Sequence, residues 1–199
     1  MRKTIIAVFD FDGTITRKDT LLEFIRFTRG NRKFYGCFLL FSPLLIAMKL
    51  KMLPNWQVKQ RMFSFLYRGV SIEMFNQWGA EFYAIIDHML RPKAMEALKL
   101  HRINKDKIVI ISASVENWIA PWAIKNNIDT IVATKIEVDK KGLLTGRFLT
   151  KNCYGQEKVN RFLELFPNRS DYQLVAYGDS RGDREMIEFA DDGFYNVFK

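Results

Sequence analysis

Apolar runs occur at the start of the chain and alternate with amphipathic segments over its last hundred or so residues. The apolar runs are continuous and rich in Ile and Val, which is typical of strands buried on both faces of a parallel sheet. These predicted strands are residues 5–9, 107–113, 130–133 and 173–177, with a last strand at 194–198 and a hairpin at 137–139 and 143–148. Helical patterns lie between them at residues 92–102, 115–126, 156–166 and 184–189. The alternation predicts an α/β fold with a doubly wound parallel sheet.

A long helical region interrupts this alternation after the first strand. It predicts four helices, at residues 21–28, 33–51, 56–67 and 72–90. Asp19 or Thr20 caps the first of these helices, which ends near Gly30. Pro43 breaks or kinks the second, and Asn55 and Ser71 cap the third and the fourth. About a hundred residues separate the ends of the first two strands, whereas a single crossover needs only a few tens. We therefore expect a helical cap at residues 17–91, inserted into a core formed by residues 1–16 and 92–199.

Composition places the chain among soluble-type globular proteins in a reducing compartment. Its 199 residues are 48% hydrophobic, enough for a core with an appended smaller unit. Cys37 and Cys153 are far apart and lack metal-type spacing, which predicts a cytoplasmic location with neither a disulfide framework nor a zinc site. The basic start followed by an apolar run resembles a signal peptide, but Asp10 and Asp12 interrupt the run too early.

Positive charge is concentrated in the predicted cap. The formal net charge is +9, and residues 17–91 hold twelve Lys and Arg against five Asp and Glu. Such a block is typical of a surface that binds nucleic acid, anionic lipid or a phosphorylated substrate, and equally of a solvated helical surface with no partner. No RNA-binding or zinc-finger pattern accompanies it, so no nucleic-acid partner is expected.

An uncharged run at residues 34–48 lies within this basic block. It is shorter than the roughly 20 residues that span a bilayer. Arg29, Arg32, Lys33, Lys49 and Lys51 flank it. The run fits peripheral contact with the inner face of a membrane, a hairpin buried between cap helices, or a dimer face. The buried hairpin or dimer face is the favoured interpretation, and the oligomeric state is left open.

Two carboxylates follow the first predicted strand directly. Asp10 and Asp12 are spaced i, i+2, so a strand directs both the same way. Like charges held this close repel unless a cation lies between them or one keeps its proton. The pair therefore indicates a Mg²⁺ site, a nucleophile beside an acid, or both. An EF-hand loop is excluded because Leu21 stands where that loop needs Glu.

Further polar groups follow the later strands or open a helix. They are Ser112-Ala113-Ser114, Lys158, and Gly178 through Asp183. Carboxyl ends of strands in a doubly wound sheet share one edge, so we expect these groups to converge. A carboxylate nucleophile, an acid, a hydroxyl, a lysine and a metal-binding carboxylate are the parts that phosphoryl transfer needs.

These motifs resemble those of the haloacid dehalogenase superfamily of phosphohydrolases. Asp10-Phe11-Asp12-Gly13-Thr14 matches its first motif, Ile110 to Ser114 its second, Lys158 its third and Gly178 to Asp183 its fourth. A cap between motifs one and two is similar to the subgroup containing phosphoserine phosphatase. The apolar stretch in the cap is similar to phosphatidylglycerophosphate phosphatases of the same subgroup. The fourth motif reads GDSRGD, which departs from the GDGxND usual in phosphoserine phosphatases.

The resemblance implies a role for each matching residue. Asp10 would be the nucleophile and Asp12 the general acid and base. Mg²⁺ would be held by the Asp10 side chain, the Asp12 backbone carbonyl and Asp179. Asp183 would orient the lysine or a water on the metal. The substrate-binding residues would be Gly13, Ser112, Ala113 and Lys158.

The expected function is Mg²⁺-dependent hydrolysis of a phosphomonoester through an aspartyl-phosphate. The substrate would be a small phosphorylated metabolite such as phosphoserine, or a lipid phosphate head group. Phosphotransferase or phosphomutase activity stays open, because alcohols as well as water attack an acyl-phosphate. A basic protein that only binds nucleic acid or membrane is the alternative outside enzymes.

Overall fold

A five-stranded parallel sheet forms the centre of the computed structural model, which describes residues 3–128 and 130–199. The predicted core also contains residues 1 and 2, which lie outside the described residues. Its strands, in spatial order, are β3 (Thr130–Thr134), β2 (Lys107–Val115), β1 (Thr4–Phe9), β6 (Tyr172–Gly178) and β7 (Asp192–Tyr195). Each neighbouring pair is parallel. The predicted α/β fold with a doubly wound sheet is confirmed.

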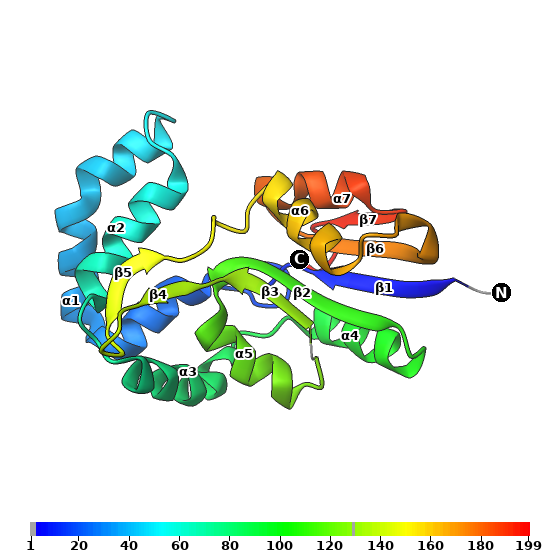
Figure 1. The fold of residues 1–199 in the computed structure, drawn as a ribbon, viewed down its shortest axis with the longest axis horizontal. Coiled ribbons are helices and arrows are strands. Elements are labelled where there is room, and N and C mark those ends of the chain that lie inside the picture. Colours follow the sequence, from blue (N-terminus) through cyan, green and yellow to red (C-terminus); the bar gives the residue numbers. More distant parts are fainter. Residues whose placement is uncertain (1–2, 129) are drawn as a thin grey trace.

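Helices cover both faces of this sheet (Figure 1). One face carries α4 (Pro92–Ile103) and α5 (Glu116–Lys125), and the other carries α6 (Gln156–Leu165) and α7 (Arg184–Phe189). Two short 3₁₀ turns, Arg169–Asp171 and Arg181–Asp183, precede β6 and α7. Side chains of β1 alternate between the faces. Ala7 and Phe9 join one buried cluster, while Ile6 and Val8 join the other.

The helical region gathers at the left of Figure 1, beyond the carboxyl ends of the strands. It consists of α1 (Thr20–Lys49), α2 (Asn55–Tyr67) and α3 (Ile72–Asp87). Gly30 has a φ of 75°, which breaks the helical path inside α1 and confirms the predicted boundary between two helices. The predicted break or kink at Pro43 is wrong as a break, since the helix continues through it. The Ser42 hydroxyl donates to the Leu39 carbonyl at 2.8 Å, an acceptor that Pro43 has no N–H to reach.

Two predicted boundaries differ from the structure at segment ends. The last strand is Asp192–Tyr195, earlier than the predicted 194–198, because Asn196 adopts a φ of 57° and leaves the strand. Phe198 instead stacks on other aromatic rings of the core. Helix α3 ends at Asp87 instead of residue 90, because Leu90 pairs with Thr16 in a short antiparallel bridge.

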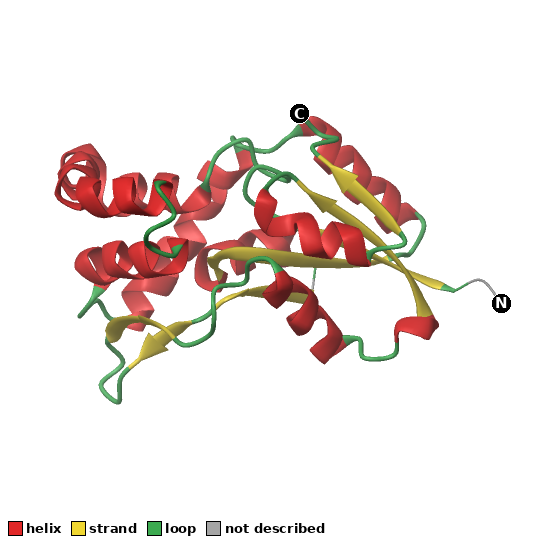
Figure 2. Ribbon diagram, turned by 90° about the horizontal axis from the view of Figure 1, so that it is seen from above, coloured by secondary structure: helices red, strands yellow, loops and turns green. Residues whose placement is uncertain are grey.

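The predicted hairpin forms, but it lies against the helical region and not in the main sheet (Figure 2, lower left). Strands β4 (Ile136–Val138) and β5 (Leu144–Phe148) pair antiparallel. The rings of Phe63 in α2 and Phe148 in β5 lie 5.3 Å apart. The Gly69 N–H donates to the Leu144 carbonyl at 2.8 Å. A segment from the second half of the chain therefore supports the predicted cap helices; the division at residues 17–91 stays a prediction.

Helix α3 fixes the helical region to the core through α5. Pro121 in α5 leaves the Asn117 carbonyl without its usual N–H partner. Gly79 of α3 approaches that carbonyl so closely that a Cβ would overlap it. The Trp122 indole donates to Asp87 at 3.0 Å. Close backbone approach and polar contacts together hold the two helices in one register.

The uncharged run at residues 34–48 is half buried. Phe34 and Cys37 face the core, while Leu39 and Ile46 are exposed. Of the favoured interpretation, the buried hairpin is therefore wrong for the outward half of this helix, while the dimer face stays a prediction. Among the described residues, the structure has no helix with the length and apolar character needed to cross a bilayer.

Candidate active site

Asp10 and Lys158 form the centre of a buried cluster at the carboxyl edge of the sheet. Asp10 directly follows β1, and its N–H donates to the Tyr177 carbonyl at 2.9 Å. The Lys158 ammonium lies in the first turn of α6, where it donates to Asp10 Oδ1 at 2.6 Å and to the Ile111 carbonyl at 3.0 Å. A single side chain thus joins the ends of the adjacent strands β1 and β2.

Asp183 holds the lysine from the opposite side. Its Oδ1 accepts from Lys158 Nζ at 2.5 Å. Its Oδ2 accepts from the N–H of Asp179 at 3.2 Å and from the N–H and hydroxyl of Ser180 at 2.9 and 2.8 Å. Burial favours the neutral acid, but Lys158 and Ser180 outweigh it and lower the pKa of Asp183. Both of its oxygens are therefore occupied in positioning neighbouring groups.

The pKa values of Asp10 and Lys158 are both raised, but for different reasons. Burial raises the pKa of Asp10 to about 8, although Lys158 counteracts part of the shift. For Lys158, burial opposes the charge, yet Asp10 and Asp183 more than compensate and raise its pKa. The lysine is consequently a permanent cation, and a second cation beside Asp10 would favour the carboxylate form of that residue.

Asp12 lies in a separate hydrogen-bond network at the start of α1. Its Oδ1 accepts from the Thr20 N–H at 2.6 Å, and its Oδ2 accepts from the Ser114 hydroxyl. The Trp118 indole in turn donates to the Thr20 hydroxyl at 3.1 Å. Burial, with a contribution from nearby Asp19, raises the pKa of Asp12 to about 6. A carboxyl group tuned toward neutrality suits the transfer of protons.

Ser112 and Ala113 lie beside this network near the end of β2. Ser112 is buried, one residue after the Ile111 carbonyl that binds Lys158. Its oxygen accepts from the Ser114 N–H at 3.1 Å. The Ala113 carbonyl accepts from Thr134 at 3.0 Å. These contacts fix the backbone of the segment while the Ser112 hydroxyl keeps its proton to donate.

The acidic cluster has the features of a cation site. One oxygen from each of Asp10, Asp179 and Asp183 lies within 4.8 Å of the others. Asp179 Oδ1 is buried and has no hydrogen-bond partner among the described residues, while Lys199 Nζ lies 3.2 Å from its Oδ2. A Cβ on Gly13, whose φ is 85°, would overlap the Asp179 carboxylate. Hard carboxylate oxygens in a tight space are the ligands Mg²⁺ takes in proteins.

The structure brings every predicted site residue to this one edge of the sheet. Their individual roles stay predictions. The sequence gives no indication of the site contacts that three further residues make. Ser114 lies in the second motif without a role of its own, and Thr20 is predicted only as a helix cap. Arg91, which donates to the Gly13 carbonyl at 2.9 Å, lies 78 residues from it and gave no local signal.

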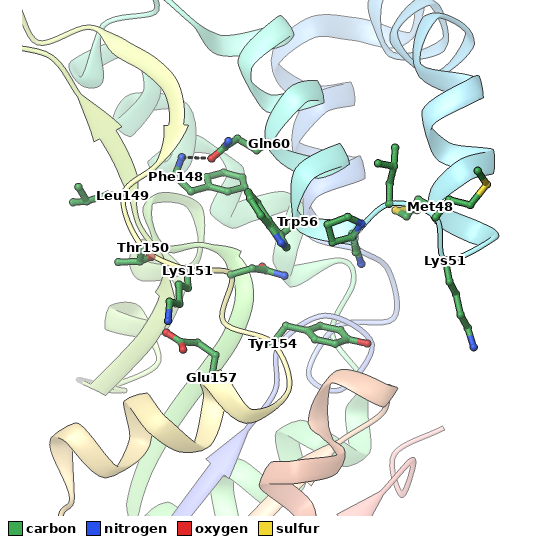
Figure 3. Close-up of a pocket in the computed structure, with 15 residues that line it drawn as sticks. Met48, Lys51, Trp56, Gln60, Phe148, Leu149, Thr150, Lys151, Tyr154 and Glu157 are labelled. Carbon is green, nitrogen blue, oxygen red and sulfur yellow. Dashed lines mark hydrogen bonds between the residues drawn. The ribbon is translucent and has the colours of Figure 1, made fainter.

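A wide cleft opens between the helical region and the core (Figure 3), and none of its described lining residues belongs to the acidic cluster. Its volume is about 1100 Å³. Figure 3 shows Trp56 and Phe148 above Tyr154, whose ring packs where a Cβ on Gly182 would lie. The lining of the cleft also includes Glu157, which precedes Lys158 in the chain. Its other lining residues are Met48, Lys51, Met52, Leu53, Pro54, Asn55, Gln60, Leu149, Thr150, Lys151 and Asn152.

A family profile described as haloacid dehalogenase-like hydrolase matches residues 7–188, which include the whole acidic cluster. The chain belongs to this family. The predicted membership is thereby confirmed, and the protein is a hydrolase by family.

Relatives and solved structures agree with this assignment. Protein CicA of Caulobacter vibrioides is 32% identical over 196 residues, which cover 98% of this chain and 87% of CicA. A Bordetella pertussis Tohama I protein of unknown function has a TM-score of 0.81 at 21% identity, covering 94% of this chain and 87% of that one. A phosphoserine phosphatase, solved as a phospho-aspartyl intermediate analogue, has a TM-score of 0.64 at 21% identity, covering 98% and 86%. The fold of this hydrolase is thus also that of a phosphatase.

Proposed function

We propose that this hydrolase cleaves phosphomonoesters through a phosphoryl group carried covalently on Asp10. The observation that supports the proposal most directly is the buried pairing of Asp10 with Lys158 beside a second acid, Asp12. A carboxylate next to a fixed cation suits attack on a phosphoryl group, because the cation offsets the negative charge of the incoming phosphate.

In the first half-reaction, a carboxylate oxygen of Asp10 attacks phosphorus and the bond from phosphorus to the leaving oxygen breaks. Asp12 gives its proton to that oxygen, so the product leaves as an alcohol. Lys158 and the Ser112 hydroxyl hold the phosphoryl oxygens. The hydrogen bonds from Thr20 and Ser114 keep the Asp12 carboxyl oriented.

In the second half-reaction, Asp12 takes a proton from water, and the water oxygen attacks phosphorus. The bond between phosphorus and Asp10 breaks, which releases inorganic phosphate and restores the carboxylate. The same carboxyl group serves as acid and then as base, and a pKa near neutrality fits both tasks.

Mg²⁺ fits the oxygens that remain available. We assign it to the Asp10 side chain, the Asp12 backbone carbonyl and Asp179, whose free buried oxygen supports this choice. Asp183 is a poorer ligand because Lys158 and Ser180 already occupy its oxygens. When bound, the ion would offset the charge of the phosphate and favour the ionised form of Asp10.

The cleft between the helical region and the core supports a choice of substrate class. Trp56, Phe148 and the lysines Lys51 and Lys151 line it. Such a lining suits a phosphomonoester whose leaving group is larger than the phosphate and partly apolar. Both a small phosphorylated metabolite, as in the structurally similar phosphoserine phosphatase, and a lipid phosphate head group fit this description. Hydrolysis rates across phosphoserine, sugar phosphates, nucleotides and short-chain lipid phosphates would separate them.

The decisive experiment replaces the proposed nucleophile. The parent with Mg²⁺ should hydrolyse an activated aryl phosphate, and Asp10→Asn should lower kcat by about 10⁴-fold or more, as removal of other enzymes' nucleophiles does. Asp171→Asn is the matched control, since Asp171 is exposed and far from the site in the fold. Full activity of Asp10→Asn would show that another group attacks phosphorus.

A second variant tests the covalent intermediate itself. Asp12→Asn removes the base that activates water, so acid-quenched protein should carry one added phosphoryl group by intact mass. Peptide mapping should place that group on Asp10. Turnover without any trapped phosphoprotein, in parent and variant alike, would favour direct attack by water instead.

A further inference from the structure

The outward side of α1 has an unusual composition for a helix surface. Its exposed residues include Tyr35, Leu39, Leu40 and Ile46, and the exposed Leu50 caps its C-terminal end. Leu39 is 78% exposed and Ile46 60% exposed. No charged residue occurs between Lys33 and Lys49, so this helix is apolar on the side facing solvent as well as on the side facing α2. We call these five residues the outer face of α1.

An apolar stripe of this length needs an explanation, because surface helices ordinarily turn polar residues outward. The side chains on the inward side of α1 already have packing partners within the protein. Phe34 and Cys37 are buried, and Phe41 packs on Phe65 of α2 with ring centroids 5.6 Å apart. The outer face is therefore not needed to hold α1 in place.

Charge decides what can cover the outer face. From residue 24 to residue 72 the chain has nine Lys and Arg and no Asp or Glu. Arg32 and Lys33 precede the stripe, and Lys49 and Lys51 follow it. A second copy docked here would bring like charges together, whereas an anionic lipid surface offers both opposite charge and an apolar layer.

We propose that the outer face of α1 docks on an anionic membrane surface, with the helix lying along the interface. Apolar side chains enter the boundary between head groups and acyl chains, and the lysines at both ends contact phosphates. This inference is separate from the proposed function, because it needs no particular chemistry at Asp10.

The position of the cleft connects docking to substrate access. Met48 in the last turn of α1, and Lys51 and Met52 just beyond it, line the cleft (Figure 3). The same lining includes Glu157, the residue before Lys158 in the chain. Docking would thus place the cleft near the lipid head groups. The consequence that the substrate is a lipid phosphomonoester rests on the proposed function, while docking itself does not.

Vesicle co-sedimentation tests the proposal. The full chain should bind vesicles of phosphatidylglycerol and phosphatidylcholine, bind pure phosphatidylcholine at least about tenfold more weakly, and dissociate as salt screens the charges. Leu39→Asp/Ile46→Asp should lower binding to the anionic vesicles at least about tenfold. Ile103→Asp/Leu165→Asp, which changes two exposed aliphatic residues of the core, should bind like the parent.

A charge-reversal pair tests the electrostatic part. Lys33→Glu/Lys49→Glu should also lower binding at least about tenfold. Lys93→Glu/Lys99→Glu makes the same change in net charge on exposed positions of α4 and should have a much smaller effect. All four variants should hydrolyse a soluble aryl phosphate at the parent rate. That assay separates failure of docking from failure of the proposed function.

Three outcomes would overturn the proposal. The parent fails to bind anionic vesicles, or binds neutral vesicles equally well, or the Leu39→Asp/Ile46→Asp variant binds like the parent. Sedimentation velocity of the parent and of this variant measures whether the outer face of α1 binds a second copy instead. A dimer of the parent that is lost in Leu39→Asp/Ile46→Asp would make a second copy the occupant of the outer face.

Discussion

The acidic edge of the sheet and the outer face of α1 reverse the usual placement of residues in opposite ways. Charged residues are seldom buried and large aliphatic residues seldom gather on a surface. At the sheet edge Asp10, Lys158 and Asp183 are buried but paired with one another. On α1, Leu39 and Ile46 are exposed and contact solvent.

The difference lies in where each region finds its partners. The buried charges find them within the chain, in the pairs that Lys158 forms with Asp10 and Asp183. Lys33, Lys49 and Lys51 form no salt bridge with any described residue, and the apolar stripe beside them is uncovered. Internal pairing indicates chemistry performed inside the molecule, whereas an unpartnered surface indicates contact with something outside it.

Replacing the buried lysine should have the largest effect on stability. Lys158→Met removes the cation between Asp10 and Asp183 while nearly keeping side-chain volume. Breaking a buried ion pair typically costs about 3–5 kcal/mol because an uncompensated charge stays buried. Urea unfolding should show a loss of that size, and hydrolysis of an aryl phosphate should be lost as well.

The exposed residue Lys99 provides the control for this prediction. Lys99→Met makes the same chemical change on the surface of α4 and should alter the free energy of unfolding by less than about 0.5 kcal/mol. Equal losses in the two variants would contradict the idea that Lys158 stabilises the sheet edge by charge pairing.

Removing the hydroxyl bonded to Asp12 should have an intermediate effect. Ser114→Ala takes away one of the two hydrogen bonds that orient Asp12, the other coming from the Thr20 N–H. A hydrogen bond to a charged group contributes about 1.5–3 kcal/mol, so kcat should fall about 10- to 100-fold. KM should change little, because Ser114 positions Asp12 and does not hold the phosphate.

The matched change for Ser114 is Ser170→Ala, at an exposed position of the turn before β6. It should leave kcat and KM unchanged. A Ser114→Ala variant that raised KM at constant kcat would mean that this hydroxyl binds substrate directly.

The sequence predicted the sheet and the site edge well because both depend on local pattern. Continuous apolar runs mark the parallel strands, and each polar group of the site lies near the carboxyl end of a strand or opens a helix. Lys158 was predicted from its place in the motif order, although it lies 148 residues from Asp10. The topology of a doubly wound sheet converts that order into proximity.

The errors concern contacts between distant segments. No local pattern indicates that the hairpin at β4 and β5 packs on α2, or that Arg91 holds the Gly13 carbonyl. The sequence left open whether the 34–48 run is buried in a hairpin, forms a dimer face or contacts lipid, because apolar residues give the same pattern in a core and at an interface. Only the position of Phe34 and Cys37 on one side, and of Leu39 on the other, separates these cases.

Replacing Gly13, which lies next to the acidic cluster, should lower stability less than Lys158→Met does and should weaken metal binding specifically. Gly13→Ala places a Cβ against the Asp179 carboxylate and forces alanine into a φ of 85°. The left-handed conformation costs about 1–2 kcal/mol, and displacement of a ligand should weaken Mg²⁺ binding about 10- to 100-fold. Thermal shift on titration with Mg²⁺ measures that affinity without relying on activity.

The control Gly69→Ala separates the effect of backbone strain from the effect of displacing Asp179. Gly69 has a φ of 81°, and beyond its chain neighbours no atom of the described residues lies within 4 Å of the position that a Cβ would take, so Gly69→Ala adds backbone strain without displacing another group. It should lose a similar amount of stability and keep the parent's affinity for Mg²⁺. Unchanged affinity in Gly13→Ala would argue against Asp179 as a ligand.

The smallest effect on stability is expected on the outer face of α1. Leu39→Asp/Ile46→Asp should change the free energy of unfolding by less than about 0.5 kcal/mol in the absence of lipid, since these side chains lose no buried contacts. Phe34→Asp, on the inward side of the same helix, should instead cost several times more, because Phe34 is buried and packs against Phe38. Urea unfolding of both variants measures the contrast. A large loss in the outer pair would mean that α1 depends on its exposed face for folding, which would make those apolar residues part of the core rather than a docking surface.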